Sequence, residues 1–215
     1  MVDVVWDRPE ADARATVVLG HGAGGPMDSA FMNRLAAALV AEGLAVARFE
    51  FAYMASRRVD GKKRPAPKAE LLVSEYATAL AEILAASSGP VAIGGKSMGG
   101  RVAAMLSGVE LDPRVIALAC FGYPFHPIGE PDRLRRAPID QSRLATIILQ
   151  GERDEFGNRD YVEALNLDPA VQLIWLTDGN HDFGPRGRSE ATLKGNITLS
   201  ARALASYIDR LIAPV

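Results

Sequence analysis

Residues 87–100 read SSGPVAIGGKSMGG, and this stretch decides how the rest of the chain is interpreted. It contains Gly-Lys-Ser, which ends the phosphate-binding pattern GxxxxGK[ST], and it also contains GxSxG at residues 95–99. With Gly95 and Lys96 fixed, the phosphate-binding pattern needs a glycine at position 90, where the chain has Pro90. The intervening residues, VAIG, are typical of a strand, whereas phosphate is held by the amides of an irregular loop. Lys96 is therefore not predicted to bind phosphate.

The GxSxG pattern fits its surroundings. The apolar strand expected over residues 90–95 precedes it, and a helix is expected to begin near Met98. A strand, a sharp turn and a helix make a nucleophile elbow, in which the serine backbone is strained and the side chain projects at the carboxyl edge of a sheet. Gly95 and Gly99 would remove side chains that clash in such a turn. Ser97 is the candidate nucleophile.

Short, almost continuous apolar runs recur along the chain and predict strands. They lie at residues 15–20, 44–51, 90–95, 115–121, 145–151 and 171–176, and VVWD near the start could add an edge strand. Such runs are typical of a parallel sheet that is covered on both faces. Segments of helical period separate them, so we expect a doubly wound, mostly parallel α/β fold in a single domain over residues 1–215.

Three longer helices are expected, at residues 30–42, 69–86 and near 197–212. Their apolar stripes predict core positions at Phe31, Leu35 and Leu39, at Leu72, Tyr76, Leu80, Ile83 and Leu84, and at Ile197, Ala201, Leu204, Ile208 and Leu211. Residues 52–68 and 122–143 form the longest connections and are expected to be irregular. Both follow the carboxyl ends of strands, where open α/β sheets build their binding crevices.

The bulk composition favours an unexported, water-soluble protein. A chain of 215 residues with 48% hydrophobic residues can bury a substantial core. A net charge of −2 does not suggest a partner with the charge of nucleic acid or of a membrane surface. The N-terminus lacks the pattern of a signal peptide, and no run is long enough to span a membrane, so we expect a cytoplasmic location. The lone Cys120 lies in an apolar run and is expected to be a buried, inert thiol.

A second glycine-rich stretch, LGHGAGG, follows the strand expected at residues 15–20. Gly20, Gly22 and Gly25 satisfy GxGxxG, which could indicate dinucleotide binding with Glu50 at the end of the next strand. Pro26 and the cap residues after it would delay the helix beyond the glycines, which does not suit a bound pyrophosphate. The alternative is a loop whose backbone amide helps to form an oxyanion hole. We expect the amide of Ala23, or secondarily of Gly24, to act with that of Met98.

An acid and a base follow Ser97 in the order Ser, Asp, His. Asp154 lies just after the strand at residues 145–151, and His181 lies between the last strand and the last helix. This order and these places are the ones that the elbow-containing fold uses for its triad. Glu152 and Asp178 are alternative acids. Of the two other histidines, His21 is expected to fix its own glycine-rich loop, and His126 comes too early in the chain to be the base.

Taken together, GHGAGG, GKSMGG, GERD and GNHDF resemble the motifs of the α/β-hydrolase superfamily over nearly the whole chain. The chain is similar in particular to small, lidless, dienelactone-hydrolase-like bacterial hydrolases with the elbow GKSMGGR. This resemblance implies a serine nucleophile and carboxylic esters as the usual substrates. The chain differs from many relatives because residues 122–144 leave no room for a cap domain, and from dienelactone hydrolases proper because they have cysteine where this chain has Ser97.

The expected reaction is acyl transfer to Ser97, with His181 as base, Asp154 as the residue that orients it, and water releasing the acyl group. An ester, thioester, lactone or peptide would use the same triad. No cofactor or metal is expected, because the histidines lack ligand spacing such as HExxH. A non-catalytic scaffold that kept the fold is the alternative.

Basic residues crowd three connections at the expected active-site edge. The hypothesis that they attract an anionic small-molecule substrate stands beside the reading that they are solvated loop charges. The basic residues of the first connection are Arg57, Arg58, Lys62, Lys63, Arg64 and Lys68, those of the second are Arg133, Arg135 and Arg136, and those of the third are Arg186 and Arg188.

Overall fold

Within residues 3–213, which the computed structural model describes, seven strands form one sheet in the order β1-β3-β2-β4-β5-β6-β7. Neighbouring strands are parallel, except that β1 is antiparallel to β3. The strands are β1 (Val4–Asp7), β2 (Thr16–Gly20), β3 (Ala45–Phe49), β4 (Val91–Lys96), β5 (Val115–Phe121), β6 (Ala145–Gly151) and β7 (Gln172–Leu176). All six predicted strands and the edge strand VVWD are confirmed.

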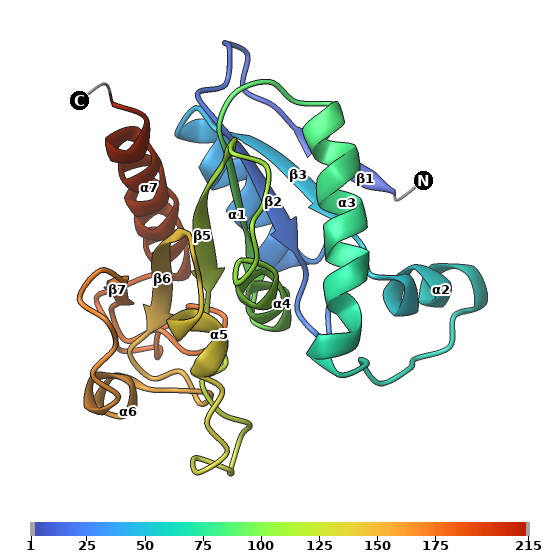
Figure 1. The fold of residues 1–215 in the computed structure, drawn as a ribbon. Helices are drawn as coiled ribbons and strands as arrows, with labels where there is room; N and C mark the ends of the chain where they lie inside the picture. The colour runs from blue at the N-terminus through green and yellow to red at the C-terminus, as the bar shows by residue number, and fades with distance from the viewer. Residues whose placement is uncertain (1–2, 214–215) are drawn as a thin grey trace.

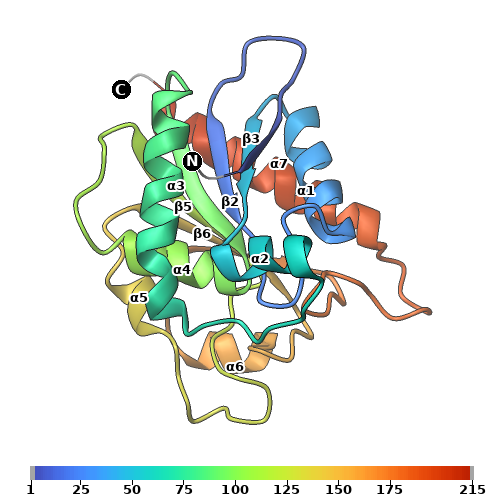
Figure 2. The same ribbon diagram turned by 90° about the vertical axis from the view of Figure 1, so that its right-hand side faces the viewer.

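Helices cover both faces of the sheet (Figures 1 and 2). On one face lie α1 (Ala30–Ala41) and α7 (Leu193–Ile212), and on the other lie α3 (Val73–Ala85) and α4 (Met98–Leu106). Shorter helices lie in the connections: α2 (Ala52–Asp60), the 3₁₀ helix η1 (Ala69–Leu72), α5 (Ala137–Asp140) and α6 (Arg159–Ala164). The doubly wound α/β fold is confirmed.

The sheet separates two hydrophobic cores, because alternate residues of each strand point to opposite faces. In β2, Val17 and Leu19 pack with α1 and α7, whereas Val18 packs with α3. Cys120 of β5 is fully buried, as predicted, and burial raises the pKa of its thiol well above the usual range.

Three details differ from the sequence predictions. Residues 52–60, expected to be irregular, form α2, which buries Met54 and ends at Gly61 with a left-handed φ of 69°. The second connection likewise contains a helix, α5. Leu211, predicted to be a core residue, is 40% exposed because neither core cluster reaches the last turn of α7.

The carboxyl ends of the parallel strands bring the candidate site together. The loop at residues 21–25 follows β2, the elbow follows β4, Asp154 follows β6 and His181 follows β7. Between β5 and β6 the chain has only α5 and loops, so no cap domain is inserted there. None of the helices within residues 3–213 combines the length and apolar character needed to cross a membrane.

Candidate active site

Ser97 occupies a strained turn between β4 and α4. Its φ is 51° and its ψ is −113°, a combination that a residue with a side chain adopts only at a cost. The turn is held by the amide of Ser97, which donates to Phe121 O of β5 over 3.0 Å. A Cβ atom on Gly95 would lie 2.3 Å from Gly20 O, and one on Gly99 would lie 2.2 Å from the same oxygen. Both glycines are therefore required for the elbow to pack against β2.

We expect Gly99→Ala to destabilise the protein by about 1–3 kcal/mol or more, because the added methyl group meets backbone atoms that cannot move independently. Urea unfolding at pH 7 measures this loss. Gly187→Ala is the matched control, because a Cβ atom there meets nothing within 4 Å. Equal stability of the two variants would show that the elbow tolerates a looser contact with β2.

Asp154 and His181 form a hydrogen-bonded pair at the ends of β6 and β7. His181 Nδ1 lies 3.0 Å from Asp154 Oδ1 and 2.9 Å from Oδ2. The carboxylate is fully buried and also accepts hydrogen bonds from Gln150 Nε2 and from the amide of Phe156. These contacts fix its orientation and present it to one edge of the imidazole.

The two alternative acids lie elsewhere. Glu152 pairs with Arg159 and accepts from the amide of Asp178. Asp178 pairs with Arg153 and Arg186, and hydrogen bonds from the Arg186 amide and guanidinium hold the pKa of Asp178 below its usual range. Of the three acids considered from the sequence, Asp154 is the one that reaches His181.

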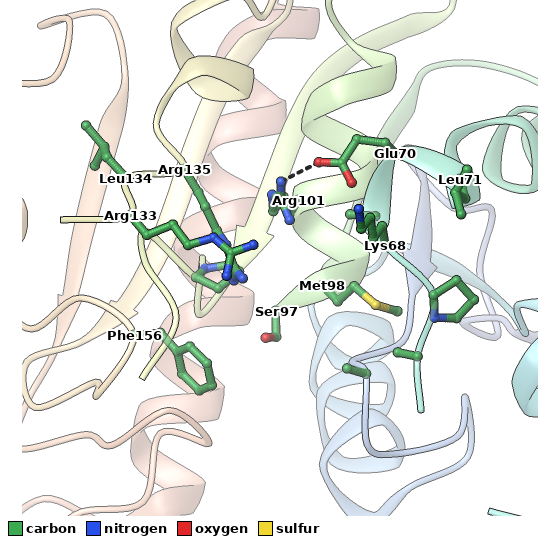
Figure 3. A pocket seen from close by; sticks show the side chains of 15 residues that line it. Lys68, Glu70, Leu71, Ser97, Met98, Arg101, Arg133, Leu134, Arg135 and Phe156 are labelled. Carbon is green, nitrogen blue, oxygen red and sulfur yellow. Dashed lines mark hydrogen bonds and ion pairs between the residues drawn. The ribbon is translucent and has the colours of Figure 1, made fainter. Parts of the chain in front are cut away.

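Ser97 lines a cavity of about 660 Å³ together with Ala23, Met98 and Phe156 (Figure 3). The ring of Phe156 packs on His181 with 4.3 Å between centroids, so the imidazole lies next to this cavity. No hydrogen bond joins Ser97 Oγ to His181 within the described chain. Such contacts are often long in unliganded enzymes and tighten when substrate binds.

His21 fixes the loop that follows β2, as predicted. Its Nδ1 lies 2.8 Å from Gly22 O, and its Nε2 accepts the amide of Phe51 over 3.2 Å. Burial lowers the pKa of this histidine and keeps the ring neutral, which suits one donor and one acceptor nitrogen. Tyr53 Oη also donates to Ala23 O, so the loop is held on both sides.

The candidate oxyanion donors differ in position. Ala23 and Met98 line the cavity beside Ser97. Gly24 is exposed and does not line the cavity.

His126 is buried against the ring of Tyr161, with 4.5 Å between centroids, and its Nδ1 lies 2.7 Å from Pro127 O.

Lys96 is a buried cation that the sequence analysis did not place in the site. Its ammonium lies 3.3 Å from Asp182 Oδ1, yet it makes no hydrogen bond of good geometry within the described residues. A Cβ atom on Gly122 would lie 3.3 Å from Lys96 Nζ and 3.4 Å from His181 Nδ1, so the ammonium lies close to the imidazole. Desolvation lowers the pKa of Lys96, and the charges of Asp182 and Asp154 oppose this change.

We expect Lys96→Met to be more stable than the natural protein at pH 7, by about 1–4 kcal/mol, because a buried charge without hydrogen bonds is replaced by an apolar side chain. Since the folded pKa of Lys96 is lowered, the unfolded chain binds more protons between that pKa and about 10.4. Stability of the natural protein should therefore rise with pH in this window and approach that of the variant. Urea unfolding at pH 7, 8 and 9, with the exposed Lys63→Met as control, measures the difference. A variant that is less stable at pH 7 would contradict the expected cost of the ammonium.

Comparisons with known proteins agree with the observed fold. Residues 13–209 match the alpha/beta hydrolase domain family, and the chain belongs to it. No curated protein matches the sequence. Among solved structures, the chain is similar to an alpha-beta serine hydrolase homologue from Coxiella burnetii, with 20% identity, a TM-score of 0.67, and coverage of 99% of this chain and 92% of that one.

Two further structures share the fold. A serine hydrolase without a lid from Xanthomonas campestris has 20% identity and a TM-score of 0.66, with 100% and 91% of the two chains covered. A dienelactone hydrolase from Anabaena variabilis has 18% identity and a TM-score of 0.69, with 99% and 93% covered. The predicted resemblance to lidless, dienelactone-hydrolase-like proteins is confirmed at the level of the fold.

Proposed function

We propose that the protein is a serine hydrolase that cleaves a carboxylic ester, or a related acyl bond, of a small molecule. The observation that carries the proposal is the 2.9 Å contact between His181 and the buried Asp154, beside a cavity that the strained Ser97 lines. Three groups in the roles of nucleophile, base and orienting acid are the requirement for this chemistry. The names of structurally similar proteins, among them serine hydrolases and esterases, support the same reaction class.

In the proposed mechanism, Ser97 Oγ attacks the acyl carbonyl while His181 Nε2 takes the hydroxyl proton. Asp154 holds Nδ1–H and stabilises the imidazolium. The amides of Met98 and Ala23 receive the developing oxyanion, each contributing about 3 kcal/mol. His181 then gives its proton to the leaving group. Water attacks the acyl-enzyme by the reverse sequence of proton transfers and releases the acid.

Labelling with a fluorophosphonate probe tests this proposal. We expect one covalent adduct on Ser97 in the folded protein, and we expect hydrolysis of some members of a panel of 4-nitrophenyl esters with different acyl lengths. Heat-denatured protein is the control for non-specific labelling. A folded protein that takes up no probe and hydrolyses no ester would instead favour a non-catalytic scaffold.

A further inference from the structure

The cavity beside Ser97 carries more positive than negative charge. Lys68, Arg101, Arg133 and Arg135 line it, and Glu70 is the acidic residue among its lining side chains. Arg101, Arg133 and Arg135 extend toward the same part of the cavity, above Ser97 in the view of Figure 3. An anionic group in this part of the cavity would meet several cations near the proposed reaction centre.

Of the eight other cations in the three basic connections, four have carboxylate partners of their own. Arg58 pairs with Asp28 and Glu50, Arg64 with Asp60, Arg136 with Asp140, and Arg186 with Asp178. Ion pairs of this kind leave little net field for a substrate. These four cations are therefore poor candidates for binding a substrate anion, and the cations nearest to Ser97 are those that line the cavity.

Arg101 and Arg135 have unused hydrogen-bonding capacity. Arg101 lies on α4, one turn after Ser97, and one of its terminal nitrogens donates to Glu70 over 2.8 Å. Its buried Nε has no hydrogen-bond partner among the described residues. The Arg135 guanidinium makes no hydrogen bond or ion pair within residues 3–213. Burial and the neighbouring charges of Arg101 and Arg133 lower the pKa of Arg135. A bound anion would relieve this repulsion and accept hydrogen bonds from N–H groups of the two guanidiniums.

We propose that Arg101 and Arg135 form a subsite that binds a carboxylate or phosphate-like group of the substrate beside Ser97. The guanidinium fork matches the two oxygens of such a group. Arg133 contributes less, because its side chain is 67% exposed and already contacts Glu130. This inference rests on the proposed function, and it narrows the substrates to acyl compounds that carry an oxyanion.

The test compares three 4-nitrophenyl esters of similar length: glutarate with a free carboxylate, 4-phosphonobutyrate, and the neutral methyl ester of glutarate. We expect kcat/KM of at least one anionic ester to exceed that of the neutral ester by about tenfold or more, because charge-assisted hydrogen bonds contribute this order of selectivity. The larger of the two anionic values identifies the preferred oxyanion. The advantage should shrink between about 0.02 M and 0.5 M salt.

Arg135→Gln and Arg101→Gln should each lower this anionic preference, which is the ratio of kcat/KM for the anionic ester to that for the neutral ester, by about tenfold. Arg202→Gln on α7 makes the same chemical change outside the cavity and should leave the preference unaltered. Arg135→Lys should restore part of it, since charge is kept but the fork is lost. If kcat/KM is about equal for the anionic and the neutral esters and no variant changes this ratio, the subsite does not exist. Hydrolysis of the neutral ester would in that case still leave the proposed function intact.

A binding measurement separates the subsite from catalysis. In Ser97→Ala protein, free glutarate or inorganic phosphate should raise Tm in a concentration-dependent way, because a ligand of the folded state stabilises it. Arg135→Gln added to Ser97→Ala should abolish this rise. If neither anion changes Tm in the parent variant, the subsite does not exist, whether or not the protein is a hydrolase.

Discussion

With Ser97 replaced by alanine, kcat for the best ester is expected to fall by about four to six orders of magnitude. The nucleophile and its base act as a unit, so removal of the hydroxyl leaves only the weak catalysis given by substrate binding and the oxyanion donors. Alanine, like serine, has a Cβ atom, so the substitution adds no new backbone strain at position 97, and the fold should remain intact. Steady-state kinetics together with thermal unfolding separate loss of chemistry from loss of structure.

Ser74→Ala is a suitable control, because Ser74 is exposed on α3 and does not line the cavity. It should retain full activity. A Ser97→Ala protein that kept more than about a tenth of the natural rate would exclude Ser97 as the nucleophile.

The second large effect concerns Asp154→Asn, for which we expect kcat to fall by about four orders of magnitude. An amide in place of the carboxylate favours the histidine tautomer with the proton on the wrong nitrogen. The loss should be severe but smaller than that of His181→Ala. Steady-state rates on the same ester measure both.

Glu152→Gln is the matched control, because Glu152 lies two residues earlier and contacts Arg159 and the Asp178 amide rather than His181. We expect its activity to stay within a few-fold of the natural protein. If Glu152→Gln were the more damaging change, the role of the orienting acid would belong to Glu152.

The sheet was predictable because its strands are buried on both faces. A strand such as Val115–Phe121 has apolar residues at nearly every position, and a parallel sheet then fixes which chain segments meet at its carboxyl edge. This geometry also allowed Asp154 and His181 to be predicted as neighbours. Helix α2 escaped prediction because its single buried position, Met54, provides no repeating apolar stripe.

Electrostatic partners could not be predicted in the same way. The sequence shows that Arg58 and Arg135 both follow strand ends. Arg58 is neutralised by the nearby Glu50 and by Asp28, which lies 30 residues earlier, whereas Arg135 has no carboxylate partner within residues 3–213. The position of Arg101 near Ser97 could have been predicted, since residues one turn apart lie on the same side of a helix. The burial of Lys96 could not, because a lysine in the middle of GKSMGG gives no indication that its side chain is buried.

The strained backbone at Ser97 has a consequence for how the protein evolves. A non-glycine residue in such a conformation costs the folded state about 1–3 kcal/mol, which is a substantial part of the stability of an ordinary domain. Selection for thermostability alone would therefore favour glycine at this position, and only selection for turnover would retain serine. Under the proposed mechanism, the elbow is a local trade-off between stability and activity, and a lineage that lost the reaction would be free to relax it.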